Sequence, residues 1–189
     1  MAAGLLVLLA AALALRPDPG GAHRLVAVAA RDLSPGIALT IEDVRMENRS
    51  AATLPDGSQS LDQVLGATLA GPARRGEVLT DARVLGSRLS ELSAGRDARV
   101  VPLHLADSAV LDVVRTGDIV DVLGATTGAA EAHPRLVAAN AVVVLVSPAG
   151  PATSRGPGSD RVVLVALPAA AATALAGATL VQTVTLTIH

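Results

Sequence analysis

Two segments of this 189-residue chain, forty positions apart, carry nearly the same sequence. Residues 33–44 read LSPGIALTIEDV and residues 73–84 read ARRGEVLTDARV, with Gly, Leu, Thr and Val at equivalent places. Self-similarity at a fixed spacing indicates a repeated structural unit. Each copy predicts a tight turn at Gly, a short apolar segment, a Thr cap and one helical turn that ends at Val. We therefore expect the two copies to be symmetry-related arms of one β module.

The side-chain composition narrows the fold and the function further. The chain is 51% apolar, yet it has no Phe, Trp, Tyr or Cys, and every basic residue is Arg. A core without aromatic rings is built from small branched side chains, which favours thin β-layers. The net charge of −2 and the missing aromatic stacking platforms disfavour nucleic-acid binding. The absence of Cys excludes disulfides and thiolate chemistry. The heavy use of Ala, Val, Leu and Arg is typical of a GC-rich, actinobacterial source.

The N-terminus carries an unbroken apolar segment at 2–15, followed by RPDPGG. A helix of that length spans about 21 Å, less than the roughly 30 Å hydrocarbon core of a bilayer. The length fits a signal-peptide core, and Ala12-Leu13-Ala14 resembles a cleavage signal, although the basic flank is missing. A buried core helix is the alternative, which the Pro/Gly-rich break weakens. We expect residues 1–16 to be a transmembrane or signal segment, with an anchor favoured over cleavage.

Composition also suggests where the domains begin and end. After a linker at 17–23, residues 24–86 contain both copies of the repeat, and residues 86–99 are rich in Gly, Ser and charge without clear periodicity. We therefore predict one domain at 24–86 and a second at 98–189. A run of Pro, Gly and Ser predicts a mobile surface loop at 147–159.

Local patterns predict a mainly β protein with short helices, of the α+β class. In the first domain they predict a strand at 24–30, a helix at 41–44 capped by Thr40, an extended piece at 45–48 and a capped helical turn at 60–64. In the second domain they predict strands at 98–105, 119–123, 136–146 and 161–167, with a helical turn at 108–114 capped by Asp107. A helix from Pro168 to Ala176, stopped by Gly177, leads to an alternating strand ending at Ile188, with Val184, Leu186 and Ile188 inward.

Side chains that carry chemistry do not converge in this pattern. His23, His104, His133 and His189 lack the spacing of a metal site, and we interpret them as solvated or structurally satisfied. Asp118 and Asp121, with Asp112 nearby, resemble paired carboxylates, but positions 118 and 121 of a strand point to opposite faces. We interpret Asp118 as a turn residue and Asp121 as facing solvent or an Arg.

Other catalytic patterns are missing too. No Ser has an adjacent His or a G-x-S-x-G elbow, and without Lys a P-loop is impossible. We therefore predict no catalytic residue, no metal and no cofactor, and a protein that is not an enzyme.

Two parts of the chain resemble known families. Residues 26–36, 39–44, 64–66 and 76–80 resemble a SAF domain, a small β-clip module also found in antifreeze-like domains and flagellar P-ring chaperones. Residues 115–122, 136–146 and 162–188 resemble the second part of the Flp/tad pilus assembly protein family CpaB, also called RcpC. The resemblance implies a SAF/β-clip domain followed by a small α/β domain, preceded by an N-terminal membrane helix.

That resemblance implies a non-enzymatic scaffold of Flp (type IVb, tad) pilus assembly. It would be a single-pass protein of the cytoplasmic membrane with its bulk outside, and its partners would be other pilus-assembly proteins. The alternatives are a module that binds cell-wall glycan, or a periplasmic-type assembly chaperone related to the P-ring chaperones. Arg31 and Asp32 at the first turn, with Arg74 and Arg75 at the second, are the candidate interaction residues. Ordinary solvated turn residues are the alternative interpretation of these four.

Overall fold

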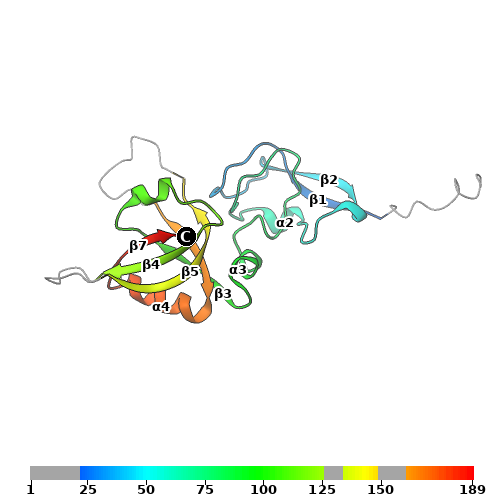
Figure 1. Cartoon of the computed structure of the whole chain (residues 1–189). Coiled ribbons are helices and arrows are strands. Elements are labelled where there is room, and N and C mark those ends of the chain that lie inside the picture. The colour runs from blue at the N-terminus through cyan, green and yellow to red at the C-terminus, as the bar shows by residue number, and fades with distance from the viewer. Residues whose placement is uncertain (1–21, 126–133, 149–160) are drawn as a thin grey trace, which may run out of the picture.

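The computed structural model describes residues 22–125, 134–148 and 161–189. They form two lobes, each with its own sheet and its own apolar core (Figure 1). The expected membrane segment at 1–16 lies outside the described residues, as do most of the linker and most of the loop at 147–159. Within the described part of the chain, no helix is long and apolar enough to cross a membrane. The lobes are mainly β with short helices, which confirms the α+β class. The domain limits at 24–86 and 98–189 stay predictions.

The first lobe is built on a two-stranded antiparallel sheet. β1 (His23–Ala29) pairs with β2 (Val44–Ser50), and Val26 lies opposite Glu47. The last four residues of β1 are all buried, and on the side away from β2 Ala27 and Ala29 hydrogen-bond to other segments of the same lobe. A 3₁₀ turn, η1 (Ala51–Thr53), and a helical turn, α2 (Leu61–Val64), follow. In α2 the Ser60 N–H donates to Gln63 Oε1 at 2.8 Å, so the capped turn predicted here is confirmed.

The two repeat copies are folded alike around a local two-fold relation. Gly36 and Gly76 both have left-handed φ angles, 81° and 85°. Backbone hydrogen bonds recur at the forty-residue offset: Gly36 N–H to Leu69 O and Gly76 N–H to Ala29 O; Ala29 N–H to Glu77 O and Leu69 N–H to Ile37 O; Leu39 N–H to Ala67 O and Leu79 N–H to Ala27 O. Where the copies meet, Leu33 and Ala73 exchange backbone hydrogen bonds of 2.8 and 3.1 Å. The predicted symmetry of the arms is confirmed.

The helix expected at 41–44 is a single turn. Residues 41–43 form that turn, and Val44 already begins β2. The Asp43 carboxylate accepts a hydrogen bond from the Thr40 N–H at 3.0 Å, as a capping residue does, but Asp43 itself is buried. The Asp43 carbonyl accepts a hydrogen bond from the N–H of Ala30, the residue after β1. The chain therefore begins to pair with β1 at Asp43 instead of continuing as a helix.

The second lobe begins with α3 (Ser87–Ala94), which the sequence predicted as an irregular boundary. β3 (Ala98–Leu103) and a 3₁₀ turn, η2 (Ser108–Asp112), follow, and the Asp107 side chain caps η2 as predicted. Next come β4 (Ile119–Ala125), β5 (Arg135–Val146) and β6 (Val163–Pro168). The chain ends with α4 (Ala169–Thr179) and β7 (Thr183–Ile188). α4 continues two residues beyond Gly177, so the predicted stop at that glycine is wrong.

All neighbouring strands of the second sheet are antiparallel, in the order β3-β6-β5-β4-β7. The small α/β domain implied by the resemblance is therefore an antiparallel sheet with added helices. Leu105, just after β3, bridges Val184 of β7, so the sheet curls until its two edges approach each other. Val184 and Leu186 point into the core as predicted, whereas Ile188 is 44% exposed. Val120 and Val122 of β4 are buried in the same core. Ile188 lies at the end of the last strand, where the lobe no longer covers that face.

Candidate functional site

The four predicted interaction residues lie on the two symmetric turns, but they are not four free side chains. Asp32 accepts a hydrogen bond from Arg74 Nη1 at 2.7 Å and from the Arg75 N–H at 2.9 Å. The Arg75 N–H, followed by the Arg74 side chain, holds the pKa of Asp32 below its usual range. Asp32 thus joins the first turn to the second, and Arg75 keeps an exposed side chain without an ion pair among the described residues.

Arg31 makes a different contact, with the buried carboxylate of Asp43. Its Nε and Nη2 donate to Asp43 Oδ1 at 2.9 and 2.5 Å. The Asp43 side chain is only 3% exposed, and its other oxygen accepts from the N–H and the hydroxyl of Thr40. The Thr40 N–H is the largest cause that lowers the pKa of Asp43, with the Thr40 hydroxyl and Arg31 adding to it and burial opposing it. Arg31 therefore covers a structural carboxylate and is 65% exposed itself.

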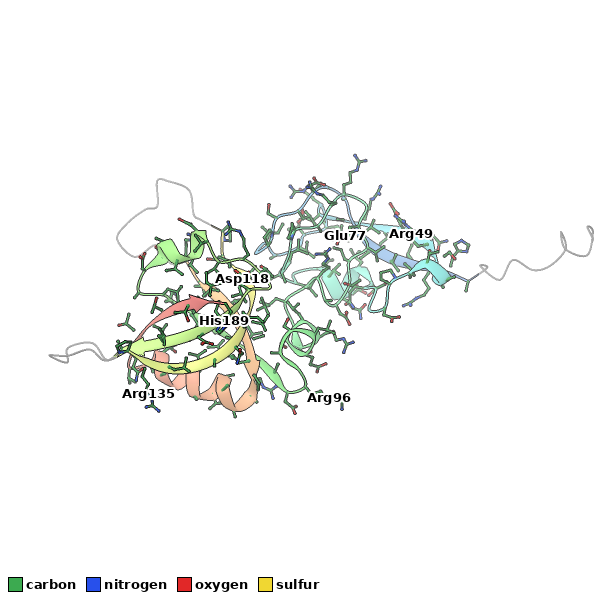
Figure 2. The ribbon with its side chains drawn as sticks, viewed as in Figure 1. Arg49, Glu77, Arg96, Asp118, Arg135 and His189 are labelled. Carbon is green, nitrogen blue, oxygen red and sulfur yellow. The ribbon has the colours of Figure 1, made fainter. Side chains whose placement is uncertain are left out.

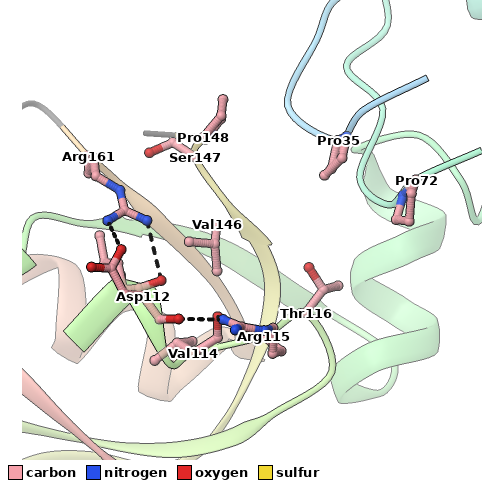
Figure 3. Close-up of a pocket in the computed structure, with 11 residues that line it drawn as sticks. Pro35, Pro72, Asp112, Val114, Arg115, Thr116, Val146, Ser147, Pro148 and Arg161 are labelled. Atoms are coloured by element: carbon pink, nitrogen blue, oxygen red, sulfur yellow. Dashed lines mark hydrogen bonds and ion pairs between the residues drawn. The ribbon is translucent and has the colours of Figure 1, made fainter. Parts of the chain in front are cut away.

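A groove of about 470 Å³ lies between these turns and the second lobe (Figure 3). Pro35 and Pro72 come from the two turns, and Pro148 and Val146 come from the end of β5 on the other side. Thr116 lies at the mouth, on the turn before β4. Proline rings carry no N–H and are rigid, so this wall is a preformed apolar surface.

The floor of the groove carries a charged pair. Arg161 Nη1 donates to Asp112 Oδ1 at 2.6 Å, and its Nη2 reaches the carbonyl of Leu111 at 3.3 Å. The Arg115 guanidinium donates to the carbonyl of Asp112 at 2.7 Å. Only 14% of the Arg161 side chain is exposed against 71% of Asp112, so a partner meets the Asp112 carboxylate together with the exposed Arg115. A mostly apolar groove with an exposed carboxylate and an exposed guanidinium suits an extended peptide segment that carries both a donor and an acceptor.

Sequence reasoning did not find this groove. Arg161 and Asp112 are 49 positions apart in the sequence. They meet only in the folded protein, where the segment just before β6 lies beside the end of η2. Pro35 and Pro72 were visible as turn residues, but nothing in the sequence indicates that both face the second lobe. The only available signal was the concentration of proline at the ends of turns and strands.

The remaining candidate groups have structural roles. Asp118 accepts from the Arg115 N–H at 2.7 Å and closes the turn before β4, as predicted. Asp121 accepts from the Asn140 N–H at 2.9 Å and pairs with His189 at 3.1 Å, where the sequence suggested solvent or an Arg. The Asn140 N–H is the main cause that lowers the pKa of Asp121. Across the described ranges, no three His, Asp or Glu side chains gather as a metal site does.

Comparison with known protein families identifies the first lobe. Residues 24–85 match the SAF domain family, which confirms that part of the resemblance and covers the first lobe. No curated protein and no solved structure matches the chain significantly. The resemblance of the whole chain to CpaB/RcpC stays a prediction.

Proposed function

We propose that this chain is a non-enzymatic, extracytoplasmic scaffold of Flp pilus assembly that acts by docking other assembly proteins. The observation that carries the proposal is the groove between the SAF turns and the second lobe. Its walls come from both lobes, so a segment bound there touches both lobes at once. The proline rings on its walls are rigid, which limits the conformational entropy lost when a partner segment binds there.

Two further features support the pilus assignment. The first lobe is a SAF domain, and the second lobe carries the strand, helix and strand that resemble the C-terminal part of the CpaB/RcpC family. The apolar segment at 2–15 precedes both, in the order of that family. The membrane location of the proposal rests on this segment alone.

Photo-cross-linking in living cells tests the docking surface. A photoreactive amino acid at Thr116, at the mouth of the groove, is expected to cross-link to a pilus-assembly protein identified by mass spectrometry. The matched control is Arg96, an exposed residue on the turn between α3 and β3, away from the groove (Figure 2). Deletion of the gene is expected to abolish surface pili, and the full chain to restore them. Normal piliation in the deletion strain contradicts the proposal.

Sedimentation with purified cell wall separates this function from glycan binding. Sugar sites commonly place an aromatic face against the ring, and this chain contains no aromatic residue. We therefore expect the full chain in mild detergent to stay in the supernatant. Saturable retention on cell wall, together with no cross-linked assembly protein, favours the glycan-binding alternative.

A further inference from the structure

β2 is the outer strand of the first sheet, and one of its edges is open. The bonds from Ala30 N–H to Asp43 O and from Ala51 N–H to Ala22 O fix the alternation of the β1–β2 ladder. Positions 45, 47 and 49 therefore direct their backbone groups towards β1, and positions 44, 46 and 48 direct theirs away from it. Among the described residues, no hydrogen bond reaches the outward N–H and C=O groups of Val44, Met46 or Asn48.

The rest of this sheet is closed. On the far side of β1, Ala27 and Ala29 bond to residues of the second arm and of the loop before α2, so the ladder continues there. Folded proteins usually protect an edge strand with proline, a bulge, short length or charged side chains. β2 is seven residues long, regularly paired with β1 and free of proline. Its charges are of both signs and already paired along one face, so they repel only a strand that does not match their order. Its open edge is a surface on which another strand can be added.

The side chains of β2 show which strand fits. On one face, Glu47 forms ion pairs with both Arg45 and Arg49, and Arg49 lies beside the sheet in Figure 2. On the other face, Val44 is buried and Met46 packs against the apolar core. A partner strand therefore needs alternating charges of the opposite order on one face and an apolar residue at its centre on the other.

A second copy of β2 meets these requirements when it runs antiparallel with Met46 opposite Met46. Arg45 then lies opposite Glu47 of the other copy, and the same pair recurs on the other side of the two-fold axis. These are non-hydrogen-bonded positions, where side chains approach most closely and opposite charges stabilise the pairing. The outward backbone groups of one copy then bond to those of the other: position 44 pairs with 48, and 46 pairs with 46. Every outward N–H and C=O group of positions 44, 46 and 48 thereby gains a partner.

Neighbouring registers fit less well. Centring the pairing on Glu47 puts two carboxylates opposite each other and Arg45 opposite Arg49, and centring it on Arg45 puts two guanidinium groups together. Like charges directly opposite are destabilising. Centring it on Asn48 keeps two opposite-charge pairs but separates the Met46 side chains.

We propose that the open edge of β2 is a homotypic interface, through which two copies form one continuous four-stranded sheet in the order β1-β2-β2-β1 about Met46. This inference does not depend on the function proposed above, because it concerns only the contact between two copies of the chain.

Cysteine cross-linking of the full chain in mild detergent tests the register. The chain contains no cysteine, so a single introduced thiol reports on its own position. Cα atoms of a hydrogen-bonded antiparallel pair are about 5.5 Å apart, within the range that a disulfide spans. We expect Met46→Cys to form a covalent dimer on oxidation. Asn48→Cys is the matched control, because its two copies would lie about 13 Å apart along the ladder. Cross-linking of Asn48→Cys instead of Met46→Cys overturns the proposal.

Charge reversal gives an independent readout in case the Met46 variant folds poorly. Arg45→Glu and Glu47→Arg each create two like-charge contacts across the axis, and we expect each to raise the dimer dissociation constant at least about tenfold. The double variant restores opposite charges and is expected to return within about threefold of the unmodified chain. Sedimentation velocity on the full chain in detergent measures all four proteins. A monomeric unmodified chain at about 100 µM, well above the dissociation constants of specific complexes, overturns the proposal. Single variants that dimerise unchanged also overturn it.

Discussion

Asp43 shows how one side chain can distinguish two otherwise equivalent arms. The turn in each copy is closed by the same backbone bond, Asp43 N–H to Thr40 O in the first and Arg83 N–H to Thr80 O in the second. The last residue of the turn differs: Asp43 points inward and binds Arg31, whereas Arg83 pairs with Glu77 near the surface. The backbone geometry therefore does not require an acid here. The acid serves to hold Arg31 and the chain that follows β1.

The stability of the first lobe is expected to depend on the charge of Asp43. Because hydrogen bonds to the carboxylate lower the folded-state pKa, the ionised form contributes stability above the unfolded-state value of about 3.9. That contribution is lost as the pH falls through the folded-state pKa. Asp43→Asn should lower the free energy of unfolding at pH 7 by about 1.5–3 kcal/mol, the usual contribution of hydrogen bonds to a charged group. Urea titrations at pH 7 and at pH 3 measure the difference.

Glu42→Gln is the control for Asp43→Asn. It removes a carboxylate at the neighbouring position, where the side chain is exposed. We expect its stability to stay within about 0.5 kcal/mol of the unmodified chain at both pH values. If the two variants lose the same stability, or if the Asp43→Asn deficit does not shrink towards low pH, Asp43 does not have the role described.

At the level of elements, the symmetric turns allow a matched comparison. Gly36 and Gly76 adopt the same left-handed conformation, but a Cβ on Gly36 would lie 3.0 Å from Pro148 Cδ. A Cβ on Gly76 would meet nothing closer than Arg45 Nη2 at 3.9 Å. Gly76→Ala is expected to cost only the conformational term, about 1–2 kcal/mol. Gly36→Ala should cost more, because it also presses the first turn against the second lobe at the groove.

A double-mutant cycle isolates that second contribution. Pro148→Ala removes the Cδ atom that the new side chain would meet, so in this background Gly36→Ala should cost no more than Gly76→Ala. Denaturant unfolding of the single and double variants measures each free energy. Equal costs for Gly36→Ala with and without Pro148 would show that the turn does not touch the second lobe in solution.

The elements predicted from the sequence are those whose pattern is local. β4 was predicted because residues 119–123 alternate, and α2 because residues 60–64 resemble a capped helical turn. In the structure Val120 and Val122 are buried, and Ser60 and Gln63 form the capping box. α3 was missed because Ser87, Ser90 and Ser93 are weak helix formers that interrupt the apolar pattern. In the structure the Ser90 and Ser93 hydroxyls donate to the carbonyls of Ser87 and Leu89, so the buried Ser90 has a hydrogen-bond partner within the helix.

The arrangement of the elements was less predictable. The last strand, helix and strand were predicted in chain order, but that order does not indicate that β5 and β4 separate β6 from β7 in the sheet. The candidate site shows the same limit. Arg31, Asp32, Arg74 and Arg75 were proposed because they occupy turns of the repeat, and their role as interaction residues stays a prediction. The groove was not predicted, because Pro35 and Pro72 line it together with Pro148 and Arg161 only as a result of how the two lobes pack.

At the scale of the whole molecule, the two cores are separate. The buried clusters of the first and second lobes share no residue, and the lobes meet at the groove through turns. Contacts of this limited kind couple domains weakly. We therefore expect two unfolding transitions in calorimetry, one for each lobe, instead of a single cooperative one.

Core substitutions assign the two transitions. Leu69→Ala removes a fully buried side chain of the first core, and Leu175→Ala removes one that α4 buries in the second. Each should destabilise its own lobe by about 2–5 kcal/mol, because the transfer free energy of the lost atoms adds to the cost of the cavity. The transition of the other lobe should move by less than a degree or two, since a weak interface passes on little of the change. If either substitution shifts both transitions together, the lobes unfold as one unit, and the groove is then a rigid part of a single cooperative core.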